Sequence, residues 1–344
     1  MWLSGLWICT TTTVDNSEVR ELIAPSKAGR LDAWLAEVLP VSRSRLKAMV
    51  VSGEIRVDGE TTRPSRKLNG GECVTVPPVS SPTTLLTPQD IPLDILHLDA
   101  QVLVVNKPAG LVVHPAPGHP DGTLVNAVLH LLETREPDAV SSDSGARLRP
   151  GIVHRLDRGT SGVMVVARTP NAHAALAAQF AAHTTDRRYL ALVHGESAET
   201  GTVNAPLGRS PRDRIRYTVV ENGKHAVTHW RRLAIGYHGI AGNARGGRVS
   251  LIECKLETGR THQIRVHMRH TGHPIVGDPL YAAKRKLPAA ILSETEVNHQ
   301  LLHAYELGFK HPETGTYMQF RSSPPEDYRR VLRELDIDFS LDSN

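Results

Sequence analysis

Cysteine is scarce in this 344-residue sequence, and its placement excludes two kinds of protein. The three cysteines, Cys9, Cys73 and Cys254, lie far apart and form no Cys-x-x-Cys pair. An odd and dispersed set predicts neither a disulfide framework nor a thiolate zinc site. We therefore expect the protein to work in a reducing compartment, the cytoplasm.

Long hydrophobic runs are missing as well. No stretch approaches the roughly 18 consecutive apolar residues that a membrane-spanning helix requires. Residues 1–9 are apolar, but they lack the basic start and the clear cleavage site of a secretory signal. We expect residues 1–27 to be a disordered lead-in, with a secretory signal as the alternative, and we expect no membrane partner.

A strong excess of charge of either sign is absent too. Lys and Arg number 40 against 36 for Asp and Glu, a formal net charge of +4, and 18 histidines add positive potential below neutral pH. This balance permits an anionic partner without demanding one. The length predicts about two domains, and no internal period indicates a repeat protein.

Residues 28–77 have the pattern of a small α/β domain. Apolar residues at helical spacing predict two helices, the second capped by Ser42, and an Asp-Gly turn with short strands completes the unit. This region resembles the S4 RNA-binding domain in the order of its motifs, which are Arg-Leu-Asp, Ser-Arg-Ser, Gly-x-Ile-x-Val-x-Gly and Gly-Gly-x-x-Val-x-Val. The apolar helix faces consist of Leu31, Trp34, Leu35 and Val38, and of Leu46, Met49 and Val50.

Basic residues gather in this S4-like region. A charge run on a helix is most often a solvated face, but the resemblance to S4 domains favours contacts with RNA phosphates. Residues 78–92 follow as a linker that proline stiffens and serine solvates. The basic residues concerned are Arg43, Arg45, Lys47, Arg56, Arg66 and Lys67.

Residues 93–335 predict an α+β domain around a mixed, mainly antiparallel sheet, and residues 336–344 an acidic tail. Residues 236–247 are Gly-rich and are expected to form a flexible hairpin tip. Strands are expected over residues 95–98, 102–106, 163–167, 188–195 and 249–256. Helices are expected over residues 123–133, over 171–183 after Thr169 and Pro170, between Thr261 and Gly272, and over 328–335.

Asp157 stands in the most informative stretch, residues 151–162. It lies between Arg155 and Arg158 on a loop that runs into a buried apolar strand. Its support is therefore rigid, and the neighbouring cations favour an ionised carboxylate. A solvated cluster of Arg and Asp explains the same residues equally well from spacing alone.

The motif at residues 154–162, His-Arg-Leu-Asp-x-x-Thr-Ser-Gly, resembles the catalytic motif of the RluA-type pseudouridine synthases. These enzymes isomerise uridine in RNA to its C-glycoside. Residues 106–115, 188–191 and 258–267 resemble the family's other motifs in the same order, and residues 277–281 and 302–304 also match. Ordered motifs are far more specific than any single one. One departure is Gly159, where many members carry an acidic residue.

The resemblance implies a role for several residues. Asp157 would be the catalytic carboxylate, Arg265 the cation that keeps it ionised, and Tyr189 the ring that stacks on the uracil. Arg155 would enter the RNA stack where the uridine has flipped out. We also expect RNA contacts from Arg260 and from Lys107, although Lys107 can equally pair with a carboxylate or top a turn.

The implied partner is structured RNA, with large-subunit ribosomal RNA favoured because an S4 domain before the catalytic domain resembles the ribosomal members most closely. Isomerisation changes no redox state, so we expect neither a cofactor nor a metal, and we expect a monomer. His262 and His267 are five residues apart without an intervening Glu, which disfavours a helical zinc pair.

Two other classes of protein compete with this interpretation. A phosphodiesterase or glycosidase built on Asp157 lacks a partner carboxylate in any motif. A non-catalytic S4-type RNA-binding or ribosome assembly protein would need only the S4-like part and a basic surface. That alternative leaves the ordered motifs without a purpose.

Overall fold

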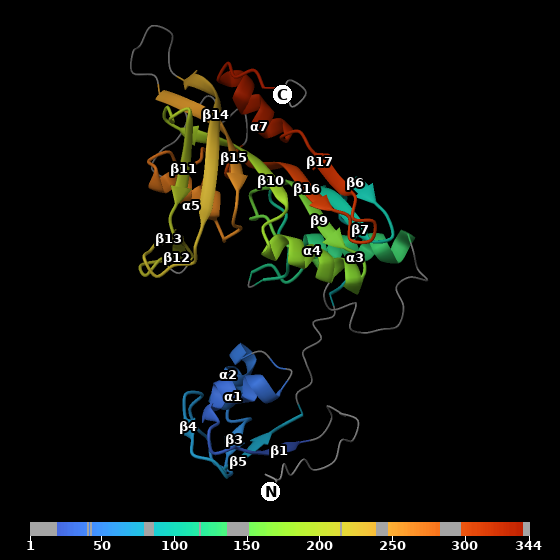
Figure 1. Ribbon diagram of the computed structural model, residues 1–344, viewed down its shortest axis with the longest axis vertical. Helices are drawn as coiled ribbons and strands as arrows, with labels where there is room; N and C mark the ends of the chain where they lie inside the picture. Colours follow the sequence, from blue (N-terminus) through green and yellow to red (C-terminus); the bar gives the residue numbers. More distant parts are fainter. Residues whose placement is uncertain are drawn as a thin grey trace, which may run out of the picture. The chain divides into compact units, whose positions relative to one another are not determined.

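The structure, a computed structural model, describes residues 19–39, 41, 43–78, 86–116, 118–135, 151–213, 215–238, 247–282 and 297–339. The chain separates into two compact units, Met1–Thr84 and Leu85–Asn344 (Figure 1). Among the helices in these described ranges, none is long and apolar enough to cross a membrane.

The first unit is a small α/β fold. Its antiparallel sheet has the strand order β1-β5-β3, and β2 pairs with β4 in a separate two-stranded ribbon. The apolar helix faces form the core, because Leu31, Leu35 and Leu46 are fully buried with Ile55 and Val74 of the strand region. The elements are β1 (Arg20–Ile23), β2 (Gly29–Arg30), α1 (Leu31–Val38), α2 (Arg43–Val51), β3 (Arg56–Val57), β4 (Lys67–Leu68) and β5 (Cys73–Val76).

The expected lead-in is wrong at its end. Strand β1 lies inside residues 1–27 and pairs with β5 from Arg20 opposite Val76 to Ile23 opposite Cys73. Its Leu22 packs against the core of the unit. Burying this apolar side chain stabilises the strand, and a disordered segment would leave the side chain in water. Val38 is 48% exposed rather than part of the buried helix face, and the predicted cap Ser42 lies outside the described residues.

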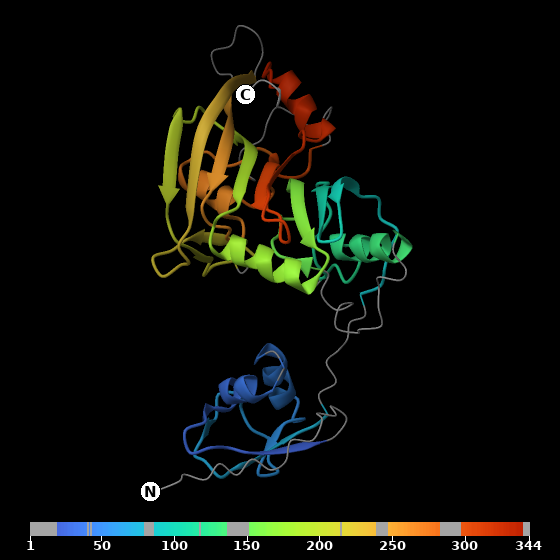
Figure 2. The same ribbon diagram turned by 45° about the vertical axis from the view of Figure 1, so that its right-hand side comes forward.

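The second unit is built on one large mixed sheet, as predicted. Its strands follow the order β11-β14-β15-β10-β16-β9-β7-β6, with β17 paired to β16 and β8 to β9 (Figure 2). Only β9 and β16 pair in parallel among the described strands. The strands are β6 (Asp94–Leu98), β7 (Val102–Lys107), β8 (Gly151–Ile152), β9 (Ser161–Ala167), β10 (Asp186–His194), β11 (Thr200–Asn204), β12 (Leu207–Arg209), β13 (Tyr217–Val219), β14 (Val227–His238), β15 (Gly247–Leu256), β16 (Leu302–Lys310) and β17 (Tyr317–Arg321).

Helices cover both faces of this sheet, which explains why its central strands are apolar at consecutive positions. Leu103 of β7 belongs to the cluster on the face that α3 and α5 cover, whereas Val104 packs with α4 on the other face. On β10 the same alternation places Tyr189 on the α5 face and Leu190 on the α7 face. The helices are α3 (Leu124–Arg135), α4 (Pro170–Ala181), α5 (Gln263–His270) and α7 (Glu326–Glu334).

Three further boundaries differ from the prediction. The expected linker already packs on the second unit after residue 86, since the Thr87 carbonyl accepts a hydrogen bond from Asn126 at 2.8 Å. The expected tail contains Ile337, which is buried beside α7. Strand β14 extends to His238, opposite Gly247, so the expected hairpin tip keeps only residues 239–246, which lie outside the described residues.

Candidate active site

Asp157 lies on the loop between β8 and β9, and this loop is anchored at its end. The carbonyl of Asp157 accepts a hydrogen bond from the Thr160 amide at 3.0 Å. Ser161 then bonds His303 of β16 at 2.9 Å, and Gly162 lies so near the Ala304 backbone that a Cβ would be 2.2 Å from its carbonyl oxygen. Only glycine fits there, so the parallel β9–β16 contact fixes the strand that carries Asp157.

Arg265 of α5 holds the carboxylate of Asp157, as the resemblance implied. Its Nη1 donates to Asp157 Oδ2 at 2.9 Å, while Nε and Nη2 form a two-point contact with the fully buried Asp278 at 2.7 and 2.9 Å. Burial lowers the pKa of Arg265, but the hydrogen bonds of Asp278 and the charge of Asp157 outweigh it and raise that pKa above its ordinary value. The guanidinium therefore remains a cation against Asp157.

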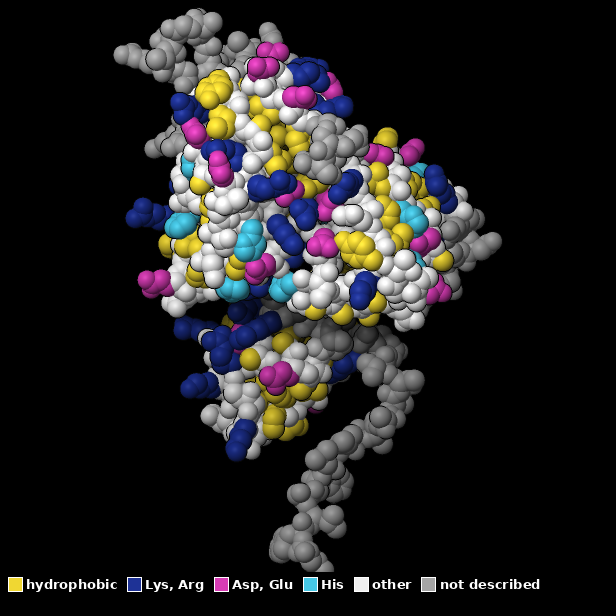
Figure 3. Space-filling view, turned by 45° about the horizontal axis from the view of Figure 1, so that its top comes forward, with side chains coloured by type: hydrophobic (Ala, Val, Ile, Leu, Met, Phe, Trp, Pro, Cys, Tyr) yellow, Lys and Arg dark blue, Asp and Glu magenta, His cyan; other side chains and the backbone are white. Residues whose placement is uncertain are grey.

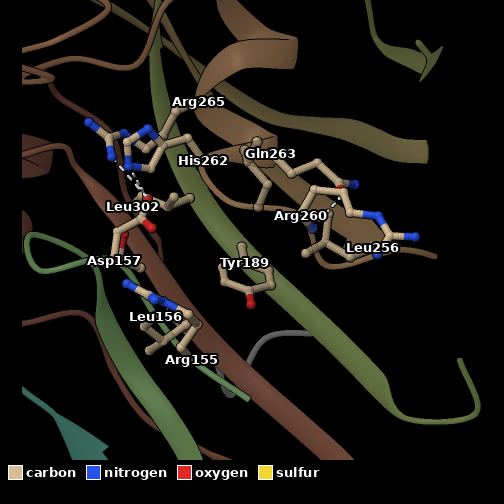
Figure 4. Close-up of a pocket in the computed structure, with 12 residues that line it drawn as sticks. Arg155, Leu156, Asp157, Tyr189, Leu256, Arg260, His262, Gln263, Arg265 and Leu302 are labelled. Carbon is tan, nitrogen blue, oxygen red and sulfur yellow. Dashed lines mark hydrogen bonds and ion pairs between the residues drawn. The ribbon is translucent and has the colours of Figure 1, made fainter. Parts of the chain in front are cut away.

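Tyr189 and apolar side chains complete a recess around this carboxylate. Tyr189 is 9% exposed, and the recess has about 350 Å³ of empty volume with Leu156, Leu256 and Leu302 along its wall. Burial raises the pKa of Tyr189, and the charge of Asp157 adds to that effect, so the phenol stays neutral. Figure 4 shows the Tyr189 ring between Asp157 and Leu256.

Arg155 and Arg260 line the same recess without contacting Asp157. Arg155 is exposed, and its side chain lies beside Leu156 at the open side of the site (Figure 4). Arg260 donates from Nε to the His225 carbonyl at 3.1 Å, and its guanidinium points away from Asp157. Both cations therefore line the recess without binding its carboxylate.

A larger recess adjoins the first and shares Asp157, Arg155 and Arg265 with it. Figure 3 shows that Lys, Arg and His side chains gather locally on the surface, with Asp and Glu between them. Positive charge is therefore concentrated in local groups on this face.

Lys107 corrects one prediction. Its side chain is fully buried, so it does not present its charge to RNA. Its Nζ donates to the carbonyls of Pro108 at 2.7 Å, Leu111 at 2.9 Å and Arg158 at 3.4 Å. Burial lowers the pKa of Lys107 to about 7 against the opposing charge of Asp157. Lys107 thus ties its own turn to the residue that follows Asp157.

The S4-unit cations divide into two groups. Arg43 and Lys47 converge with Arg30 on the buried Asp32, at 3.1, 3.5 and 3.0 Å. Hydrogen bonds from Arg30 and Arg43 hold the pKa of Asp32 well below its usual range. The second group lies away from Asp32: Arg56 and Lys67 are exposed, Arg66 pairs with Glu72 at 2.9 Å, and Arg45 is partly buried.

Three residues of the site received no role from the sequence. Asp278 and Tyr281 lie in a motif that was recognised but not explained, and His262 was weighed only as a metal ligand with His267. His267 instead bonds Thr228 at 2.9 Å, while His262 faces Asp157. His262, rather than the predicted Thr261, is also the N-cap of α5.

A carboxylate bound by an arginine beside an aromatic side chain, in a sheet domain that follows a small S4-like unit, points to an enzyme that modifies RNA. Residues 101–270 match the model of the RNA pseudouridylate synthase family, and residues 29–74 match the S4 domain. The chain is 46% identical over 329 residues to a ribosomal large subunit pseudouridine synthase D of Xanthomonas campestris, covering 93% of both.

Two more comparisons agree with this one. A protein of the same name from Xylella fastidiosa is 45% identical and covers 94% of both chains. The solved structure of human RNA pseudouridylate synthase domain containing 1 superposes with a TM-score of 0.53 at 26% identity, over 74% of this chain and 93% of that one. The chain belongs to the RNA pseudouridine synthases and carries an N-terminal S4 domain.

Proposed function

We propose that this pseudouridine synthase modifies uridines of large-subunit ribosomal RNA and that Asp157 is its reacting carboxylate. The names of the Xanthomonas and Xylella relatives support the substrate. The observation that carries the assignment of Asp157 is its contact with Arg265 inside a recess walled by Tyr189. A carboxylate held ionised beside an aromatic ring suits attack on a nucleotide that has left its stack.

The reaction breaks the N1–C1′ bond, turns the uracil and joins C5 to C1′, after which the C5 proton leaves and a proton returns to N1. Asp157 acts either by bonding covalently to the nucleotide or by removing the C2′ proton. In this proposal Tyr189 stacks on the uracil and assists the proton transfer at C5. Arg265 touches the carboxylate and keeps it charged. Net composition and oxidation state are unchanged, so the chemistry calls for no oxidant.

RNA affinity comes from cations on both units. Arg155 fills the stack left by the flipped uridine, and Arg260 contacts the strand at the rim. In the S4 unit Arg43, Arg45, Lys47 and Arg56 contact phosphates. We infer that the enzyme works in the cytoplasm as a monomer, with residues 20–77 as the RNA-binding part and residues 86–339 as the catalytic part.

The test is release of tritium from large-subunit ribosomal RNA labelled at uracil C5, with the wild type compared with Asp157→Asn. Release by the wild type alone, with RNA binding retained by the variant, is the expected result. A variant that still releases tritium would remove Asp157 from its role. Binding without release by the wild type would instead favour the non-catalytic RNA-binding alternative.

A further inference from the structure

His262 begins helix α5 in a conformation that side chains other than glycine rarely adopt. Its φ is 59° and its ψ is 20°, in the left-handed region, and its side chain makes no capping hydrogen bond. Such a backbone persists only where the surrounding structure holds it, and it is found most often at functional sites. The conformation turns the imidazole into the recess, toward the carboxylate of Asp157 (Figure 4).

A hydrogen-bond chain assigns the proton of this imidazole. His262 Nδ1 lies 2.8 Å from the hydroxyl of Tyr281, which also accepts the amide N–H of Tyr217 at 2.9 Å. The amide can only donate, so the phenol proton is free to be given to Nδ1. We assign Nδ1 as the acceptor, and in the neutral ring the remaining proton then resides on Nε2.

Tyr281 is held by the same carboxylate that orients Arg265. Its amide donates to Asp278 Oδ1 at 3.0 Å, and the Arg265 guanidinium lies over its ring at 5.1 Å. The ring of His262 packs edge-on against both Tyr281 and Tyr217, with centroids 5.6 Å away in each case. The two tyrosine rings and the hydrogen bond to Tyr281 thus fix the orientation of the imidazole.

In this orientation the imidazole faces Asp157. His262 Nε2 is 3.9 Å from Oδ2, the oxygen to which Arg265 already donates, and Oδ1 receives no hydrogen bond from the described part of the chain. Burial lowers the pKa of His262, Arg265 and Arg155 add to this, and Asp157 and Asp278 oppose it. A neutral imidazole donates a proton without adding charge to the site. At 3.9 Å the two atoms, Nε2 and Oδ2, are beyond hydrogen-bond length in the free enzyme, and contacts between catalytic groups often tighten to that length when substrate binds.

We propose that His262 is a positioning residue that donates its Nε2–H to Asp157 Oδ2, so that Arg265 and His262 together lock one carboxylate oxygen and leave Oδ1 for the nucleotide. This inference rests on the proposed role of Asp157. Tyr281 acts through His262, because its hydroxyl selects the tautomer. The imidazole therefore affects the rate on bound RNA rather than the affinity for RNA.

The experiment uses the full-length protein and single-turnover tritium release from the C5-labelled ribosomal RNA at saturating enzyme. His262→Gly removes the side chain and suits a positive φ, so backbone strain does not confuse the result. Loss of a hydrogen bond to a charged group predicts a rate about 10- to 100-fold lower with RNA affinity retained. Added imidazole should restore part of that rate. His270→Asn, an exposed histidine at the other end of α5, is the matched control and should keep the wild-type rate.

Tyr281→Phe keeps the ring under Arg265 and removes only the hydroxyl. We expect a smaller loss of rate, and we expect the double variant to be no slower than His262→Gly alone. Losses that multiply, a rate within twofold of the wild type, a defect confined to RNA affinity, or no response to imidazole would each overturn the proposal. If His262→Gly does not fold, His262→Asn, which also tolerates this φ, carries the comparison with Tyr281→Phe. An inactive wild type would refute the proposed function instead.

Discussion

Asp278 and Arg265 form a two-point ion pair that is almost completely removed from water. The two hydrogen bonds are 2.7 and 2.9 Å long, and the side chains are 0% and 5% exposed. The third guanidinium direction serves Asp157 at 2.9 Å. The buried carboxylate of Asp278 thus fixes the plane of the Arg265 guanidinium, and with it the contact between Arg265 and Asp157. The geometry of the site therefore depends on Asp278, which does not line the catalytic recess.

Asp278→Asn should therefore impair both stability and catalysis. The amide keeps the shape of the side chain but removes one of the two negative charges that face the Arg265 guanidinium. Breaking a buried ion pair lowers the unfolding free energy by about 3 kcal/mol. Denaturant unfolding and single-turnover tritium release measure the two effects. Asp94→Asn is the control: Asp94 is exposed, its side chain accepts a hydrogen bond from Asn106 at 2.9 Å, and the change should alter stability by less than about 0.5 kcal/mol. Equal changes for both variants would contradict the proposed importance of the buried pair.

Lys107 should make the stability of the second unit depend on pH in the alkaline range. Its pKa is about 7 when folded, because burial lowers it, and near the ordinary value when unfolded. Between these values the unfolded chain holds a proton that the folded chain has released. The unfolding free energy then rises with pH by up to about 1.4 kcal/mol per unit, and this contribution is lost as the pH falls toward 7.

The measurement is the difference in unfolding free energy between the wild type and Lys107→Met from neutral to alkaline pH. Taking the difference cancels other groups that titrate in this range. The wild type should gain on the variant as pH rises. A difference that stays flat or shrinks with rising pH would show that the three carbonyl acceptors keep Lys107 charged in the folded protein.

Gly159 departs from the motif that the sequence resembles, and the packing around it leaves little room for a side chain. A Cβ at this position would lie 2.6 Å from Gln300 Oε1 and 2.9 Å from His299 Cβ. Gln300 is itself held by a hydrogen bond to Thr160 at 3.0 Å. We expect Gly159→Asp and Gly159→Ala to lower the unfolding free energy by similar amounts, about 1–3 kcal/mol, because the clash is steric. Thermal unfolding compares them, and a loss seen with Asp alone would point to charge instead.

The sequence predicted the strands β6, β7, β9, β10 and β15 of the second unit because their apolar runs are bounded by turns. Consecutive residues of a strand face opposite sides of its sheet, and Tyr189 and Leu190 of β10 do so in the structure. The sequence did not bring Asp157 to Arg265, which lies 108 residues further along the chain, except through the family resemblance. Contacts of that range depend on the order of strands in the sheet, which local patterns do not encode.

Two side chains show why the remaining details were not predictable. Lys107 precedes Pro-Ala-Gly, a pattern typical of an exposed turn, yet three carbonyl oxygens from two segments enclose it. His262 follows Thr261, a better capping residue by type, but the contact with Tyr281 decides where α5 begins. In both cases a tertiary partner outweighs the local preference.

The S4 unit offers cations of two kinds, and they should differ in the salt dependence of RNA binding. Arg56 is exposed and donates to the Gly59 carbonyl at 3.2 Å, whereas Arg43, also exposed, is bound to the buried Asp32. Arg56→Ala should weaken binding and reduce the slope of log affinity against log salt by about 0.7 to 0.9. Its stability should not change.

Arg43→Ala should behave differently, because the charge of Arg43 is already partly neutralised by Asp32. We expect a smaller change of slope together with loss of stability of the S4 unit, since the carboxylate loses one of its three cations. Filter binding over about 50 to 200 mM salt measures the slopes, and Arg333→Ala on α7, where Arg333 pairs with Glu326, is the control. Suppose that Arg43→Ala lowered the slope as much as Arg56→Ala without destabilising the unit. That result would mean that RNA phosphates displace Asp32 as the partner of Arg43 when RNA binds.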